Sequence, residues 1–330
     1  MRACGLYHLW MNICVYGAGA VGGHIAARLA AAGSEVSVVA RGAHLAAIRK
    51  NGLKLIRGDE TISAKLKASE RAADLGPQDF VLVTLKANVL GAFAEACAPL
   101  LGPRTAVAFV QNGIPWWYAR EIERLDPGGR LARAISAERI LGGVAYSAND
   151  VVEPGVVLNH VPNSNMIVVG EASNESSPRV LKLRSLLEQA GMSSPAVEDI
   201  RQAIWSKLTV NLGTSTLCTI TGANIAEVRS NPRLAELAAR LGSEGRAIAA
   251  ALGVAIERAP QRPGGGQSSG MIQHKPSMLQ DYERGRPMEI DAQFMAPLAL
   301  ARQKGVPVPT LETVAALVAF KAAAKGLYIP

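Results

Sequence analysis

The sequence predicts an α/β fold: a doubly wound parallel sheet in the N-terminal part, followed by an all-α C-terminal domain. Short apolar runs rich in Val alternate with Ala- and Leu-rich stretches over the first half of the chain. Near residue 199 this alternation ends, and longer segments with a helical pattern follow. Continuous apolar strands with helices between them are typical of a parallel sheet covered on both faces, and right-handed crossovers make such a sheet doubly wound.

Four strongly apolar runs predict strands of this sheet, at residues 12–16, 35–40, 80–85 and 106–110. A helix is expected at 21–32, directly after the first strand. Residues 141–171 are rich in Gly, Asn, Val and Pro without a helical period, which predicts antiparallel strands and turns that close the edge of the first domain. A helix at 178–190 and a last strand at 194–198 complete the predicted domain.

The change in composition at 191–199 marks the expected domain boundary. We expect an N-terminal extension at 1–10, a nucleotide-binding domain at 11–198 and a helical substrate domain at 199–330. The sequence leaves open whether translation starts at the first or the second methionine of the chain.

The helical domain contains long Ala- and Leu-rich segments at 234–252 and 311–325. Their apolar faces are buried either in a homodimer interface or only in the core of their own domain. The sequence leaves both interpretations open. Two prolines and four glycines within residues 260–270 predict a loop, because neither residue type favours a regular helix.

Cysteine usage and hydropathy narrow the class of protein. The cysteines Cys4, Cys14, Cys97 and Cys218 are scattered without a CxxC pair, which favours a reducing, cytoplasmic setting and predicts neither disulfides nor a metal site. No apolar run reaches the roughly 20 residues of a membrane span, and residues 1–10 do not have the organisation of a secretory signal.

The net charge of +8 has two readings: a general surface bias, or attraction of anionic ligands such as a phosphate-rich cofactor or a carboxylate. There is no basic run and no alternation of aromatic residues with Lys or Arg, so nucleic acid is not an expected partner. The expected partner is a small anionic molecule.

The hexamer after the first strand matches the pattern GxGxxG, with residues Gly17, Ala18, Gly19, Ala20, Val21 and Gly22. The first glycine permits a tight turn, the second lets the backbone approach a pyrophosphate, and the third allows close packing of helix on sheet. The following helix presents unpaired N–H groups to the phosphates. The alternative is a tight turn without a ligand, but the strand before and the helix after favour a Rossmann-type dinucleotide site.

Arg41 lies at the end of the second predicted strand. A carboxylate at this position accepts hydrogen bonds from the ribose 2′-hydroxyl of NAD, whereas an arginine pairs with the 2′-phosphate of NADP. The sequence therefore predicts NADPH/NADP⁺ as the cofactor. The other reading of Arg41 is a solvated side chain at a strand end.

Reduction of a ketone needs a proton donor, an anchor for the substrate and a dry pocket. Lys86 and Asn112 each follow a predicted strand, at the carboxyl ends where open α/β sheets bind ligands, and Gly113 is expected to leave room for the nicotinamide. In the helical domain, Lys207 and Asn211 are spaced to share one helix face. Each of these residues, considered alone, is also consistent with an ordinary polar side chain on the surface or at a helix cap.

In this order, six motifs resemble the ketopantoate reductase family, over the chain from about Met11 to Val318. They are GxGxxG, a lysine after a strand, Asn-Gly after the next, K-x-x-x-N, S-M-L-Q-D at 277–281 and R-x-x-E-I-D at 286–291. The resemblance implies reduction of 2-dehydropantoate (ketopantoate) to pantoate with NADPH, on the route to pantothenate and coenzyme A. It also implies a C-terminal domain like that of 6-phosphogluconate dehydrogenase.

The resemblance also implies roles. Lys207 resembles the general acid that protonates the ketone oxygen, and Glu289 the carboxylate that completes its polar network on the cofactor side. Asn211, Ser215 and Ser277 correspond to substrate-binding groups. Asn112 and Lys86 resemble the pair beside the nicotinamide, with Asn112 also facing the substrate, and Arg41 the residue that binds the 2′-phosphate.

Three departures concern the substrate side. Ser215 stands where members acting on ketopantoate often have a second asparagine, and His274 where they can have another. Trp116 and Trp117 follow Asn112-Gly113 in place of a smaller pair; they either pack in a core, the favoured reading, or reshape the pocket. We therefore expect a 2-oxo acid substrate, with ketopantoate leading and another branched or larger 2-oxo acid as the alternative.

Two other functions fit parts of the pattern. One is an NADP-linked dehydrogenase of a 3-hydroxy acid or an opine-like amine with the same two-domain plan. The other is a non-catalytic NADPH-binding regulator. The presence of both Lys207 and Glu289 argues against a regulator, because a sensor needs no proton donor.

Overall fold

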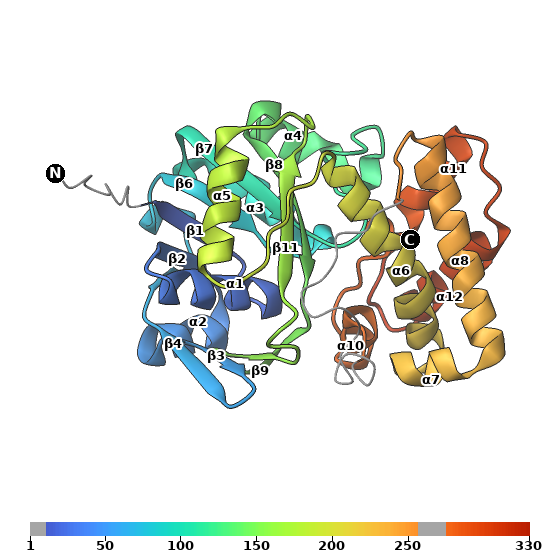
Figure 1. Cartoon of the computed structure of the whole chain (residues 1–330), viewed down its shortest axis with the longest axis horizontal. Coiled ribbons are helices and arrows are strands. Elements are labelled where there is room, and N and C mark those ends of the chain that lie inside the picture. The colour runs from blue at the N-terminus through green and yellow to red at the C-terminus, as the bar shows by residue number, and fades with distance from the viewer. Residues whose placement is uncertain (1–10, 257–274) are drawn as a thin grey trace, which may run out of the picture.

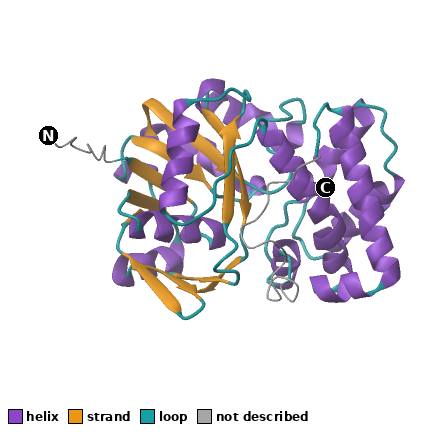
Figure 2. Cartoon of the chain, in the orientation of Figure 1, coloured by secondary structure: helices purple, strands orange, loops and turns teal. Residues whose placement is uncertain are grey.

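The computed structural model describes residues 11–256 and 275–330 (Figure 1). An α/β part and a helical part lie side by side, and the strands are confined to the first part (Figure 2). The predicted extension at 1–10, the predicted loop at 260–270 and His274 lie outside the described residues.

The main sheet has seven strands in the order β11-β8-β7-β6-β1-β2-β5. They are β1 (Asn12–Tyr16), β2 (Glu35–Val39), β5 (Lys67–Ser69), β6 (Gln78–Val83), β7 (Leu101–Val110), β8 (Ile140–Tyr146) and β11 (Met166–Glu171). All neighbours run parallel except β8 and β11, which are antiparallel. The chain order reverses beside β1, so the predicted doubly wound sheet is confirmed.

Helices cover both faces of this sheet. They are α1 (Ala20–Ala31), α2 (Gly42–Asn51), α3 (Gly91–Ala96), α4 (Arg130–Ala134) and α5 (Pro178–Gln189). In β1, Ile13 and Val15 join the apolar core that includes α1 and α5, whereas Cys14 and Tyr16 join the core of the opposite face. Because both faces are buried, the strand is apolar at successive positions rather than at alternate ones.

A second, four-stranded sheet corrects part of the prediction. Its strands are β3 (Leu53–Arg57), β4 (Glu60–Ala64), β9 (Asn149–Glu153) and β10 (Val156–Asn159), in the order β4-β3-β10-β9. Within 141–171, only the outer strands β8 and β11 close the edge of the main sheet as expected. The hairpin between them leaves that edge and pairs with β3.

The strand expected at 194–198 is wrong. Only an isolated bridge joins Ser193 to Met166 at the sheet edge. Pro195 has no N–H to donate to a ladder, and α6 begins shortly after it.

The helical part is built around one long helix. Its elements are α6 (Ile200–Thr221), α7 (Ile225–Ser230), α8 (Pro232–Ala251), α10 (Ser277–Glu283), a π-helical turn (Asp291–Met295), α11 (Ala296–Gln303) and α12 (Pro309–Ala323). The side chain of Asp199 caps α6 by accepting from the Arg201 N–H at 2.8 Å. α6 contacts β8 and β11 of the main sheet as well as α8, α10 and α12, so it joins the two parts.

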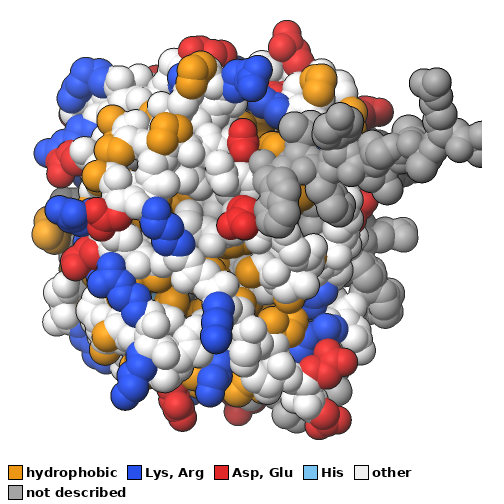
Figure 3. Space-filling model, turned by 90° about the vertical axis from the view of Figure 1, so that its left-hand side faces the viewer, with side chains coloured by type: hydrophobic (Ala, Val, Ile, Leu, Met, Phe, Trp, Pro, Cys, Tyr) orange, Lys and Arg blue, Asp and Glu red, His pale blue; other side chains and the backbone are white. Residues whose placement is uncertain are grey.

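On the surface of the α/β part that faces away from the helical part, positive and negative side chains are mixed. Figure 3 shows Lys and Arg side chains interspersed with Asp and Glu on this face, and apolar side chains scattered between them. No helix in the described parts of the chain is both long and apolar enough to cross a membrane.

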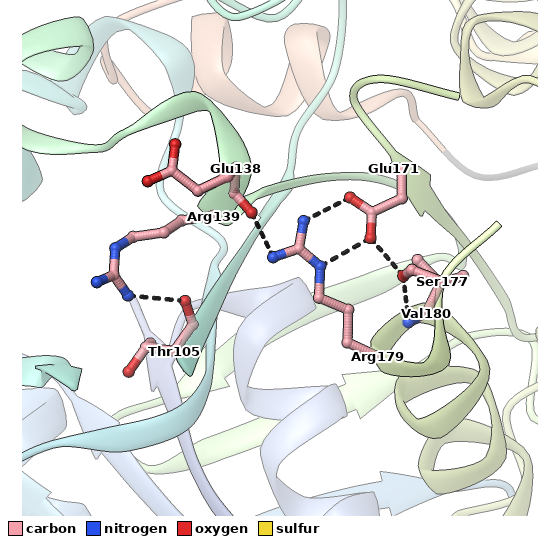
Figure 4. Close-up of polar contacts among 7 residues, drawn as sticks. All are labelled: Thr105, Glu138, Arg139, Glu171, Ser177, Arg179 and Val180. Atoms are coloured by element: carbon pink, nitrogen blue, oxygen red, sulfur yellow. Dashed lines mark hydrogen bonds and ion pairs between the residues drawn. The ribbon is translucent and has the colours of Figure 1, made fainter. Parts of the chain in front are cut away.

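A buried carboxylate ties α5 to the edge of the main sheet (Figure 4). Glu171, at the end of β11, is 6% exposed and accepts from Nε of Arg179 at 2.7 Å. It also accepts from the hydroxyl of Ser177, which caps α5 by accepting from the Val180 N–H at 3.3 Å. Arg179 donates further to the Glu138 carbonyl. One carboxylate thus holds a helix cap and an arginine in place.

Replacing Glu171 with alanine is expected to lower the free energy of unfolding by about 2–3 kcal/mol, because Arg179 then stays partly buried without its carboxylate partner. Urea unfolding followed by circular dichroism measures this.

The matched control is Glu95→Ala, which breaks an ion pair with Arg130 whose side chains are 68% and 57% exposed. It is expected to cost less than about 1 kcal/mol. Equal losses in the two variants would contradict the structural role of the Glu171 cluster.

Candidate active site

A cavity of about 700 Å³ lies between the carboxyl ends of the parallel strands and the helical part. It is lined by all but one of the residues that the sequence predicted for the site: Gly17, Ala18, Gly19, Ala20, Val21, Arg41, Lys86, Asn112, Lys207, Asn211, Ser215, Ser277 and Glu289. The structure therefore brings together side chains that are far apart in the chain. The exception is Gly22, which is buried.

The three glycines of the GxGxxG loop differ in their surroundings. Gly17 has φ +105°, a conformation that a side chain would strain. A Cβ on Gly22 would overlap the carbonyl oxygen of Gly17 and the hydroxyl of Thr84, so this position needs glycine for close packing. A Cβ on Gly19 would meet nothing within 4 Å. The backbone at Gly19 and the start of α1 are thus open to the cavity.

The junction of β2 and α2 forms the neighbouring wall. Arg41 precedes α2, and its exposed side chain lines the cavity. His44, one turn later, also lines it and donates from Nε2 to the carbonyl oxygen of Ala18 at 2.7 Å. Nothing in the sequence singles out His44, because a single histidine carries no motif.

A polar chain crosses the cavity from the helical part to the sheet. Lys207 Nζ, on α6, donates to Asn112 Oδ1 at 2.7 Å and to the Ala145 carbonyl at 2.6 Å. Asn112 Nδ2 in turn lies 3.5 Å from Glu289 Oε2, and Glu289 Oε1 accepts from the Ala87 N–H at 2.9 Å. Asn112 therefore links Lys207 to Glu289 by hydrogen bonds.

Glu289 is buried, with 7% of its surface exposed. Burial raises the pKa of its carboxyl, while the hydrogen bond from the Ala87 N–H, the charge of Lys86 and the Asn112 amide act in the opposite direction. The site thus contains a carboxylate that is costly to ionise and is held by donors from the α/β part.

A second link between the two parts joins Lys86 Nζ to the carboxylate of Asp281 on α10. Burial raises the pKa of Asp281, and the Lys86 charge partly offsets this. Asp281 is a cavity residue to which the sequence reasoning gave no role, although it belongs to the S-M-L-Q-D motif. Its importance is visible only once Lys86 is placed opposite it.

The remaining predicted polar residues extend along two helices. Asn211 and Ser215 follow Lys207 at successive turns of α6 and line the same cavity. Ser215 is buried and Asn211 is half-buried, whereas Ser277, the first residue of α10, is exposed. These groups form a polar side of the cavity opposite the GxGxxG loop.

Two expectations near Asn112 have clear outcomes. Gly113 does not leave room for a ligand: it has φ +78°, and a Cβ there would overlap the carbonyl oxygen of Ala292 in the helical part. Trp116 and Trp117 are 2% and 6% exposed and do not line the cavity. The favoured reading of this pair as core packing is confirmed.

In the part of the chain that the structure describes, no group of three or more His, Cys, Asp or Glu residues is placed to hold a metal ion. The cavity instead combines a glycine-rich loop at a helix N-terminus, several cations and one amide-bridged Lys–Glu chain. Such a donor set suits an extended phosphate-containing ligand beside a small oxygen-rich one.

Two family models together match most of the chain. "Ketopantoate reductase PanE/ApbA" matches residues 13–174, and "Ketopantoate reductase PanE/ApbA C terminal" matches residues 199–322. The 2-dehydropantoate 2-reductase of Mesorhizobium japonicum is 41% identical over 328 residues, which cover 96% of this chain and 100% of that protein.

Solved structures agree with this result. A candidate ketopantoate reductase from Ralstonia solanacearum MolK2 superposes with a TM-score of 0.86 at 35% identity, covering 96% of this chain and 99% of that one. D-mandelate dehydrogenase, solved with NADH and anilino(oxo)acetate, has a TM-score of 0.81 at 21% identity over 96% of this chain and 100% of that one, so it shares the fold. The chain belongs to the ketopantoate reductase family and is an oxidoreductase of that family.

Proposed function

We propose that this protein reduces a 2-oxo acid with NADPH, and that its leading substrate is 2-dehydropantoate, giving pantoate for pantothenate and coenzyme A synthesis in the cytoplasm. The observation that carries the proposal is the position of Lys207 Nζ. It lies in the cavity of the GxGxxG loop and is bridged by Asn112 to the buried Glu289. The relatives named 2-dehydropantoate 2-reductase support the choice of substrate.

The residues at the dinucleotide end of the cavity fit a nicotinamide cofactor. The space beside Gly19 leaves the loop backbone free to approach a pyrophosphate, and the N-terminus of α1 favours its negative charge. Arg41 lines the same end of the cavity and supplies the cation that a 2′-phosphate requires. When bound, the cofactor supplies the hydride.

Lys207 is the proposed general acid. Its ammonium group is directed by the Asn112 side-chain oxygen and the Ala145 carbonyl, two acceptors without a formal charge. Neither acceptor takes the proton from it, so the ammonium keeps a proton for the substrate's ketone oxygen. Transfer of that proton, together with the hydride, converts the ketone to a secondary alcohol.

Glu289 and Asn112 are proposed to orient this acid. Glu289 fixes the Asn112 amide so that its oxygen faces Lys207, and Glu289 is itself fixed by the Ala87 N–H. Lys86 lies on the cofactor side, held by Asp281. Asn211, Ser215 and Ser277 line the cavity as the proposed groups that bind the substrate's carboxylate and hydroxyl.

A second candidate is reduction of another branched or larger 2-oxo acid. The observation that favours it is Ser215, which lines the cavity with a side chain shorter than asparagine and leaves more space at that turn of α6. The two candidates share the cofactor, the acid and the fold, and differ only in the chemical group that meets Ser215.

Steady-state oxidation of NADPH with a panel of 2-oxo acids tests the proposal. We expect turnover with 2-dehydropantoate or a close branched analogue, and a fall of about 10²–10⁴-fold in kcat for Lys207→Ala, because the ketone oxygen then lacks its acid. NADPH affinity should change little in this variant.

Lys304→Ala is the control, since Lys304 is exposed and lies outside the cavity. Tight NADPH binding with no turnover of any 2-oxo acid by the wild type would refute the activity. Wild-type kcat in Lys207→Ala would instead refute the assignment of the acid.

The cofactor preference is tested by Arg41→Asp. We expect this variant to weaken NADPH relative to NADH by about 2–4 kcal/mol in kcat/KM, because a paired cation becomes a repelling anion. Lys50→Asp reverses a charge on an exposed residue of α2, the helix that Arg41 precedes, and should leave the preference unchanged. An unaltered NADPH-to-NADH ratio in Arg41→Asp would contradict the choice of cofactor.

Glu289 gives a pH-dependent prediction for stability. Its folded-state pKa is raised above the ordinary value of 4.5, so the folded protein holds this proton more tightly than the unfolded chain. The resulting stabilisation is present below pH 4.5 and is lost as pH rises through the raised pKa. The Tm of Glu289→Gln minus that of the wild type should therefore increase over this range.

Glu70→Gln, at an exposed position, is the control and should show no such trend. Thermal melts at a series of pH values measure both differences. A Tm difference for Glu289→Gln that stays constant or decreases with rising pH would contradict the raised pKa.

A further inference from the structure

His44 has both ring nitrogens engaged by the backbone. Nε2 donates to the Ala18 carbonyl at 2.7 Å, and Nδ1 accepts from the Gly155 N–H at 2.9 Å. These partners define the neutral ring with its proton on Nε2. A ring held in this way has no nitrogen left for a phosphate, although its side chain lines the cavity one turn after Arg41.

The two partners of His44 belong to different structural units. Ala18 is the second residue of the GxGxxG loop, and its own N–H donates to the Val39 carbonyl at the end of β2. With the His44 contact, both backbone polar groups of Ala18 are held from the β2–α2 junction. The loop conformation that opens Gly19 to the cavity is thus supported from outside the loop.

Gly155 lies in the turn between β9 and β10 of the second sheet. It has φ +79°, and a Cβ there would lie 3.0 Å from the Cβ of Ala47 on α2, so the turn packs closely on this helix. Its carbonyl accepts from the Lys54 N–H at 2.9 Å. The turn is therefore anchored to β3 as well as to His44.

From these contacts we propose that His44 is a positioning residue for the dinucleotide: its Nε2 holds the Ala18 carbonyl of the pyrophosphate-binding loop from α2 without touching the cofactor, while the Gly155 N–H orients the ring. The proposal rests on the proposed use of a nicotinamide dinucleotide. It separates two functions at the β2–α2 junction, since Arg41 would recognise the 2′-phosphate and His44 would hold the loop that serves NADPH and NADH alike.

Substitutions can remove the two contacts one at a time. The side-chain amide of glutamine can donate from about the position of Nε2, so His44→Gln keeps the contact to Ala18. The amide oxygen of asparagine can accept at about the position of Nδ1, so His44→Asn keeps the contact to Gly155. His44→Phe keeps the ring but removes both hydrogen bonds. His160→Gln, at an exposed position outside the cavity, is the control.

Fluorescence titration of each variant with NADPH and with NADH, without substrate, gives the test. We expect His44→Gln to bind within about twofold of the wild type, and His44→Asn and His44→Phe to bind both dinucleotides about tenfold more weakly. The kcat at saturating cofactor should be unchanged in all three variants. The Tm without cofactor should be equal in His44→Gln and His44→Asn, which separates loop positioning from general stability.

Wild-type affinity in His44→Phe, or equally weak binding by His44→Gln and His44→Phe, would overturn the proposal. Loss of NADPH binding alone, with NADH unaffected, would also overturn it, because His44 would then act on the 2′-phosphate. These titrations need no substrate, so failure of the proposed reduction of 2-oxo acids would be seen separately, in the turnover assay.

Discussion

The hydrogen-bonded chain from Lys207 through Asn112 to Glu289 is the interaction on which the site depends. It joins residues from α6, from the carboxyl end of β7 and from the segment before the π-helical turn, and Asn112 and Glu289 are 177 positions apart. Neither part of the molecule holds this chain alone. The relative position of the sheet and the helices therefore decides whether the proposed acid points at the cavity.

Several features of the fold maintain that position. α6 begins at the Asp199 cap, packs on β8 and β11, and continues into the helical core, so the backbone that carries Lys207 is supported at both ends. Close contacts at Gly113 and the ion pair between Lys86 and Asp281 add links between the two parts. Lys207 and Asn112 thus lie on a long helix and at a strand end, which limits the movement of their side chains.

Much of this could be predicted from the sequence, because the main signals are local. Strands buried on both faces are apolar throughout, and the GxGxxG loop is contiguous. The second sheet was missed since β3 pairs with β10 about a hundred residues later, and both are short. His44 carries no pattern of its own, and Asp281 belongs to the S-M-L-Q-D motif, which does not indicate its partner. Their roles depend on Ala18 and Lys86, which only the folded chain brings beside them.

In the proposed reaction a bound dinucleotide would supply the hydride to the ketone carbon of a 2-oxo acid, and Lys207 would supply the proton to the ketone oxygen. Incubation with NADPH deuterated at the transferable position of C4, followed by mass spectrometry of the product, tests this most directly. The expected product is a 2-hydroxy acid with one deuterium on C2, formed in an amount equal to the NADPH oxidised. Oxidation of NADPH without deuterium in the product, or binding of NADPH without any product, would contradict it.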